Sequence, residues 1–176
     1  MTWKMKGAGW TQAALAALAL GWPAGLSAQE VPAAMTPNPE LAGDAAVAVV
    51  QELFDAMRAS DTTAMRALFA PEVGTFPSSG LNREATPAIS YASLDQWLGG
   101  VGGQEAGSLD ERITVRDVIV DDNLVTVITP YAFYYQGNFS HCGVDVFLIA
   151  RQGEEWKIAG LADTRRRGGC EGWLDE

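Results

Sequence analysis

The first half of the chain places its apolar residues at the three- and four-residue spacing of amphipathic helices. Residues 44–59 form the clearest predicted helix. A second, shorter helix is predicted from Asp61, a favourable N-cap residue, through Phe69. A third is predicted to begin at Ser93, where Gln96 completes the pattern of a capping box. The apolar face of the first helix consists of Val47, Val50, Leu53, Phe54 and Met57.

From Ser108 onward, apolar and polar residues alternate with the two-residue period of strands, and residue pairs typical of turns separate the runs. Earlier in the chain, residues 73–76 are predicted as a short strand and residues 77–91, which show no period, as a loop. Three helices followed by a four-stranded antiparallel meander predict an α+β fold, in which a curved sheet wraps around a helical layer. The four strands are predicted at residues 108–120, 124–136, 139–151 and 156–165.

The N-terminal segment has the three parts of a secretory signal peptide. Lys4 and Lys6 give a positive region, residues 11–20 form an apolar Ala/Leu run, and small residues precede a predicted cleavage site after Ala28. The apolar run is too short for a membrane span, which needs about 20 residues. We therefore predict that residues 1–28 are removed and that the protein is secreted or periplasmic.

The remainder of the chain has the composition of one small acidic domain. Residues 29–43, rich in Pro, Ala and polar residues, are predicted as a flexible tether before a domain at residues 44–176. Loss of the signal peptide, which holds two lysines and no acid, takes the net charge from −10 to −12. Such a charge repels phosphate backbones, so nucleic acid is not an expected partner.

Two cysteines, Cys142 and Cys170, lie in the predicted mature domain. In an oxidising compartment an even pair favours a disulfide, and the alternative is two separate buried thiols. The pair is too small for a structural zinc site, and the chain shows no calcium loop or phosphate-binding loop. We therefore expect neither a metal nor a cofactor.

Three stretches resemble the nuclear transport factor 2-like superfamily, which includes ketosteroid isomerase-like and SnoaL-like proteins. They are the helix at residues 47–57 with Asp61 after it, the aromatic strand at residues 131–135, and residues 153–158. Residues 139–145 and 162–170 are similar to a bacterial subset of unassigned function. The resemblance implies a cone-shaped fold of about three helices on a curved, mostly antiparallel sheet, with a pocket between them. Enzymes and non-catalytic binders share this fold, so the resemblance does not decide the function.

The candidate catalytic residues lie on the last two predicted strands. His141, the only histidine, and Asp145 point to the same face of one strand because they are four residues apart. The opposing strand has two plausible registers. A two-residue turn places Ala162 opposite Asp145, whereas a turn longer by one residue places Asp163 there.

These residues support two interpretations. In the first, Asp145 or Asp163 is a general base whose pKa burial raises, and His141 or Tyr131 donates a hydrogen bond to a developing oxyanion. In the second, the acids form a lattice of cross-strand ion pairs with Arg165 and Arg116.

Aromatic residues predict a pocket wall. Tyr131, Phe133 and Tyr135 share one face of the long strand, with Trp97 placed to close the pocket mouth and Arg165 beside it. The preferred hypothesis is non-catalytic binding of a small apolar or aromatic ligand, or homodimerisation through the sheet. The alternative is an isomerase, dehydratase or cyclase with a pocket Asp as general base, so the sequence leaves open whether the chain is an enzyme.

Overall fold

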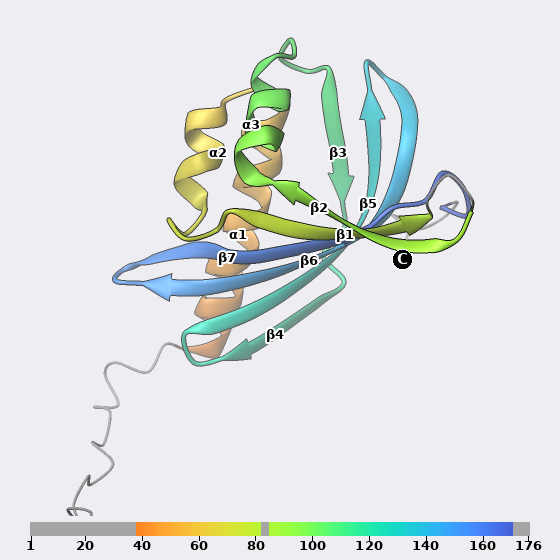
Figure 1. Ribbon diagram of the computed structural model, residues 1–176. Coiled ribbons are helices and arrows are strands. Elements are labelled where there is room, and N and C mark those ends of the chain that lie inside the picture. The colour runs from red at the N-terminus through yellow and green to blue at the C-terminus, as the bar shows by residue number, and fades with distance from the viewer. Residues whose placement is uncertain (1–37, 82–84, 171–176) are drawn as a thin grey trace, which may run out of the picture. The chain divides into compact units, whose positions relative to one another are not determined.

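The computed structural model describes residues 38–81 and 85–170, so the predicted signal peptide and most of the predicted tether lie outside the described residues. Within these ranges the chain forms three helices and seven strands (Figure 1). The helices are α1 (Pro39–Arg58), α2 (Thr62–Leu68) and α3 (Leu94–Gly102). The strands are β1 (Thr75–Leu81), β2 (Pro87–Ser93), β3 (Leu109–Ile113), β4 (Asp117–Asp121), β5 (Leu124–Tyr135), β6 (Asn138–Gln152) and β7 (Glu155–Thr164).

One mixed sheet connects all seven strands in the order β2-β1-β7-β6-β5-β3, and β4 also pairs with β5. Every strand pair is antiparallel except β1 with β7, which run parallel. Helix α1 packs across the sheet against β3, β4, β5 and β7. The predicted α+β fold with a mostly antiparallel sheet is therefore confirmed.

The predicted apolar face of α1 forms the centre of the core. Leu53 and Phe54 are buried, and the Phe54 ring meets that of Phe147 on β6 edge to face, with ring centroids 6.0 Å apart. The helix begins five residues before the predicted start, because Asn38 caps it and Pro39 occupies its first turn. Asn-Pro suits a linker and a helix N-terminus equally well. The last residues assigned to the tether are therefore helical.

Most of the segment predicted as a loop, residues 77–91, lies instead in two paired antiparallel strands. Strands β1 and β2 pair over their full length, from Thr75 with Ser93 to Leu81 with Pro87. The two-residue period is missing because β2 is an edge strand with five consecutive exposed residues. A strand with no buried face gives no alternation to detect.

The single strand predicted at residues 108–120 is two strands that pair with different halves of β5. Strand β3 pairs with residues 131–135 and β4 with residues 124–128. Between them, Thr114 and Arg116 still donate backbone hydrogen bonds to β5, at 3.1 and 2.9 Å. The alternation is continuous through this join, so the pattern could not locate the break.

The register between β6 and β7 combines both predicted alternatives. The turn is tight, with Gln152 opposite Glu155, but the register shifts at a β-bulge between Leu148 and Ile149. Beyond the bulge, Asp145 faces Asp163. A bulge adds one residue to one strand, so it changes the partners as a longer turn would.

Candidate functional site

A row of buried polar side chains crosses four neighbouring strands. Thr129 on β5 is opposite Asp145 on β6, which is opposite Asp163 on β7, which in turn pairs with Ser78 on β1. Each residue is at most 9 % exposed. Polar groups in such a position require partners, since burial without them costs free energy.

This row borders a small cavity of about 40 Å³ between the sheet and the helices. That volume holds about three water molecules. Helices α1 and α3 contribute apolar side chains to its wall, whereas β3, β6 and β7 contribute all of its carboxyls together with the apolar Phe147 and Leu161. The lining residues are Leu53, Phe54, Phe76, Trp97, Glu111, Tyr131, His141, Asp145, Phe147, Leu161, Asp163 and Arg165.

A larger cavity of about 370 Å³ adjoins the small one. The two share four lining residues, Trp97, Glu111, His141 and Arg165. We call the small cavity the inner chamber and the large one the outer chamber. The outer chamber falls within the range of about 300–1,000 Å³ that is usual for small-molecule sites. Its remaining wall consists of Met57, Gln96, Gly100, Val101, Gln104, Leu109, Phe133 and Tyr135.

The structure places all the predicted catalytic and pocket residues around these two chambers. Those proposed for catalysis, His141, Asp145 and Asp163, line the inner chamber. The five predicted pocket residues also line the chambers. Tyr131 lines the inner chamber, Phe133 and Tyr135 line the outer one, and Trp97 and Arg165 line both. Their roles stay predictions, because proximity alone does not assign a function.

Glu111 is a site residue that the sequence reasoning missed. It lies on β3 opposite Phe133, and its side chain is hydrogen-bonded to that of Asp145. Burial raises the pKa of Glu111 from 4.5 to about 7 and raises the pKa of Asp145 well above its usual value. Two adjacent buried carboxyls hold a proton between them, because both cannot ionise cheaply. The pair therefore carries a proton near neutral pH.

One carboxylate oxygen of Asp163 accepts a hydrogen bond, and the other has no hydrogen-bond partner among the described residues. Arg165 Nε donates to Asp163 Oδ2 over 2.6 Å. Oδ1 is buried, and no described residue is its hydrogen-bond partner. The predicted ion-pair lattice therefore exists only as this one pair, since Arg116 instead pairs with Asp117 at 2.9 Å. The free oxygen is an acceptor in the wall of the inner chamber.

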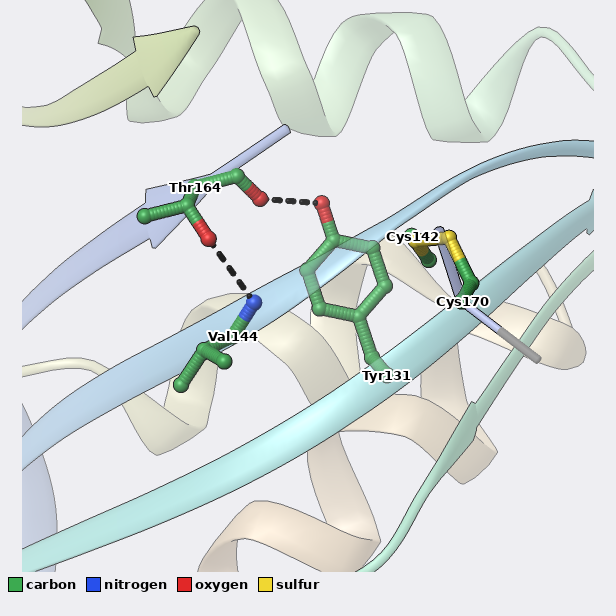
Figure 2. Close-up of a disulfide and its surroundings, with 5 residues drawn as sticks. All are labelled: Tyr131, Cys142, Val144, Thr164 and Cys170. Carbon is green, nitrogen blue, oxygen red and sulfur yellow. Dashed lines mark hydrogen bonds between the residues drawn. A yellow bond between two sulfur atoms is a disulfide. The ribbon is translucent and has the colours of Figure 1, made fainter. Parts of the chain in front are cut away.

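The Tyr131 hydroxyl donates its only proton to a backbone carbonyl. The hydroxyl donates to the Thr164 carbonyl over 2.9 Å, and Thr164 Oγ1 accepts from the Val144 amide (Figure 2). Gly143 allows the Thr164 backbone to come this close to β6, because a Cβ at this position would lie 1.7 Å from the Thr164 carbonyl oxygen. Tyr131 is therefore not a free donor for an oxyanion, contrary to one of the two predicted donor assignments.

His141 is held by aromatic rings at the junction of the two chambers. Its ring centroid lies 5.7 Å from that of Tyr131 and 5.0 Å from that of Phe133, and its Nδ1 is 3.0 Å from Ser140 Oγ. Burial, reinforced by the charge of Arg165, lowers the pKa of His141. The imidazole is therefore neutral at neutral pH and remains a candidate donor or acceptor.

The predicted disulfide between Cys142 and Cys170 is present, with 6.2 Å between the Cα atoms (Figure 2). Beside it, Cys142 and Arg166 exchange two backbone hydrogen bonds of 2.9 Å each. Together these links hold the segment after β7 against β6. The segment begins with Arg165, so the disulfide helps to keep this side chain at the chambers.

Over residues 38–81 and 85–170, no group of His, Cys, Asp and Glu side chains has an arrangement that could hold a metal ion. None of the helices in the same ranges is long and apolar enough to cross a membrane.

Comparisons with known proteins identify the fold. No protein-family model matches the sequence, and no curated protein matches it. Two solved structures of nuclear transport factor 2-like proteins of unknown function are similar. The one from Shewanella baltica has a TM-score of 0.57 at 10% identity and covers 75% of this chain and 99% of its own. The one from Silicibacter pomeroyi has a TM-score of 0.56 at 15% identity and covers 74% and 100%.

A third similar structure, from Streptomyces avermitilis, is described as a candidate dehydratase of the same family. It has a TM-score of 0.53 at 13% identity and covers 74% of this chain and 100% of its own. These likenesses establish that the chain has the nuclear transport factor 2-like fold, as the sequence resemblance implied. At such low identity they carry no function over to this chain.

Proposed function

We propose that the domain binds a small amphipathic molecule across the two chambers. One observation carries the proposal: Asp163 Oδ1 is a buried acceptor without a protein partner in the described chain, and it lines a cavity. A ligand donor would supply the missing hydrogen bond. The apolar and aromatic outer chamber would accept the rest of the molecule.

The cost of this arrangement favours a function over a structural role. Three carboxyls, those of Glu111, Asp145 and Asp163, line the inner chamber, and only Asp163 has a cation as partner there. Replacing such groups by apolar residues of similar volume is often neutral or stabilising. A domain selected only for stability therefore gains little from them. Perturbed carboxyls inside a cavity are typical of functional sites.

The pKa of Glu111, raised to about 7, favours a second candidate function, general acid–base catalysis of an isomerase or dehydratase type. A carboxyl with this pKa exchanges protons efficiently at neutral pH. Asp163 would act as the base through Oδ1, and the Glu111–Asp145 pair would return the proton. The likeness to a candidate dehydratase is compatible with this reading but does not support it beyond the fold.

Binding is tested by native mass spectrometry of the gently purified protein and by titration of a broad panel of small amphipathic molecules, followed by tryptophan fluorescence. We expect a bound molecule or a panel member that changes the fluorescence of Trp97, which lines both chambers. Trp97→Phe should abolish this change, whereas Trp156→Phe, which alters a tryptophan outside both chambers, should leave it. An empty protein that binds no panel member would contradict the proposal.

Catalysis is tested by proton exchange. The protein is incubated in D2O with a panel of small ketones and β-hydroxy carbonyl compounds, and deuterium uptake or loss of water is followed by NMR. We expect Asp163→Asn to abolish the reaction, while Glu52→Gln, at an exposed position of α1, leaves it unchanged. Tight binding without any exchange would reject the enzyme and leave the binding proposal intact.

Two further predictions concern location and assembly. The disulfide is compatible with a secreted or periplasmic protein, and we propose this location on the strength of the N-terminal sequence. Homodimerisation through the sheet also stays a proposal. It is supported by exposed apolar side chains at Val146 and Leu148 on β6, about 40 % and 39 % exposed.

A further inference from the structure

The inner chamber contains more acid than base. Glu111, Asp145 and Asp163 contribute three carboxyls, and Arg165 contributes the single guanidinium among the lining residues. Arg165 and Asp163 form one ion pair at 2.6 Å. The hydrogen-bonded Glu111 and Asp145 retain a proton between them near neutral pH, so the pair adds at most one negative charge. The lining residues therefore carry no excess positive charge that would attract an anion.

Arg165, the one cation among the lining residues, is not itself buried. The Arg165 side chain is 50 % exposed, whereas that of Asp163 is 7 % exposed. Arg165 therefore reaches Asp163 from the solvent side, and its Nε addresses only Oδ2. Oδ1, the buried oxygen, has no donor among the described residues. The inner oxygen of Asp163 therefore lines the chamber without a hydrogen-bond donor from the described residues.

The walls around this oxygen are mainly aromatic. Trp97, Tyr131 and His141 line the inner chamber, and Phe133 and Tyr135 line the outer one. The faces of such rings carry partial negative charge and attract cations. The whole chain is also strongly acidic, with a net charge of −10, which steers cations toward it and anions away.

We infer that the ligand of the proposed site is a small organic amine whose protonated nitrogen donates to Asp163 Oδ1, while its apolar body occupies the outer chamber. The inference rests on the proposed binding function and names its ligand class. The inner chamber has room for about three water molecules, which is enough for an ammonium head but not for a bulky group. A carboxylate would lie beside three carboxyls there, with Arg165 as the single lining cation.

Three probes of equal body and different head group test the ligand class. We would measure the affinities of 2-phenylethylamine, 2-phenylethanol and phenylacetate at pH 7 by calorimetry, with Trp97 fluorescence reporting the location. The inference predicts that the amine binds at least ten-fold more tightly than the alcohol, and the carboxylate most weakly. Equal or stronger binding of the alcohol or carboxylate would overturn the amine assignment and leave small-molecule binding intact.

Variants identify the contact. Asp163→Asn should weaken amine binding at least ten-fold and leave alcohol binding within two-fold, whereas Glu52→Gln should change neither. Arg165→Gln, which removes the only lining cation, should tighten amine binding and serves as the second test if Asp163→Asn fails to fold. Amine binding that is insensitive to both site variants would overturn the inference. So would the absence of binding by all three probes, and the broad panel would then decide the proposed function separately.

Discussion

Strands β6 and β7 carry two buried regions of opposite chemistry, separated by the β-bulge at Leu148 and Ile149. On the turn side of the bulge, Ile149 and Ile158 face each other and are fully buried in the apolar core. On the other side, Asp145 faces Asp163, and both are nearly as buried. We call these regions the core end and the polar end. The same pair of strands therefore supports the fold at one end and holds ionisable groups in a cavity at the other.

The difference between the two ends shows where the stability of the domain originates. At the core end, burial of apolar surface contributes about 25 cal/mol per Å². At the polar end, burial of carboxyls costs free energy that one ion pair and one shared proton only partly offset. Mutations at the two ends should therefore have opposite consequences for stability and for binding.

The largest expected effect comes from Ile149→Ala at the core end. Ile149 is fully buried and faces Ile158, so its truncation leaves a cavity and should cost about 2–5 kcal/mol of unfolding free energy. The isosteric change Asp145→Asn at the polar end should alter stability by less than about 1 kcal/mol. Urea denaturation of both variants checks this. Comparable losses would show that the polar end is a structural element.

The next effect is a dependence of stability on pH. Because the folded state raises the pKa of Glu111 from 4.5 to about 7, it favours the protonated carboxyl, and this stabilisation is lost as the pH rises through about 7. The shift corresponds to about 3 kcal/mol. The raised pKa of Asp145 acts in the same direction. The lowered pKa of His141 acts in the opposite direction, below pH 6.5.

Denaturation at pH 5 and pH 8 measures this dependence. Asp163 and Arg165 also line the chamber, so the informative quantity is the difference between the wild type and Glu111→Gln. The wild type should lose more stability than the variant between these two values. The exposed control Glu52→Gln should follow the wild type. A variant whose profile matches the wild type would show that Glu111 has an ordinary pKa.

A smaller effect is expected for Gly143→Ala, which tests how Tyr131 is positioned. A Cβ at Gly143 would lie 1.7 Å from the Thr164 carbonyl oxygen and 2.8 Å from Tyr131 Cε1. The change should cost about 1–3 kcal/mol and break the Tyr131 hydrogen bond. Gly160→Ala is the matched control, since a Cβ there meets Leu148 at an ordinary 3.6 Å. Stability is measured by thermal unfolding. Equal stabilities for the two variants would contradict the close approach of the Thr164 carbonyl to Gly143.

The sequence predicted those features that depend on a buried face or on a local cap. The apolar face of α1, the cap of α2 by Asp61 and the cap of α3 by Ser93 are all confirmed. The hairpin of β1 and β2 was missed, because β2 is exposed and has no alternating face. Local patterns report burial, so an unburied strand leaves no trace in them.

The candidate site was only partly predictable for a different reason. His141 and Asp145 could be placed on one face of a strand, but the partner of Asp145 depended on a bulge that no residue pattern marks. Glu111 lies 34 positions earlier on a strand that reaches Asp145 only across β5. Contacts of this kind come from the sheet topology, so single-chain spacing could not reveal the carboxyl pair.

The central claim, that the polar end is a ligand site, is tested most directly by NMR titration with the tightest-binding panel member. We expect chemical-shift changes at the backbone amides of Glu111, His141 and Asp145, with those of Ile149 and Ile158 at the core end unchanged. Shift changes confined to the exposed face of the sheet, at Val146 and Leu148, would contradict it. So would binding that leaves the amides around both chambers unperturbed.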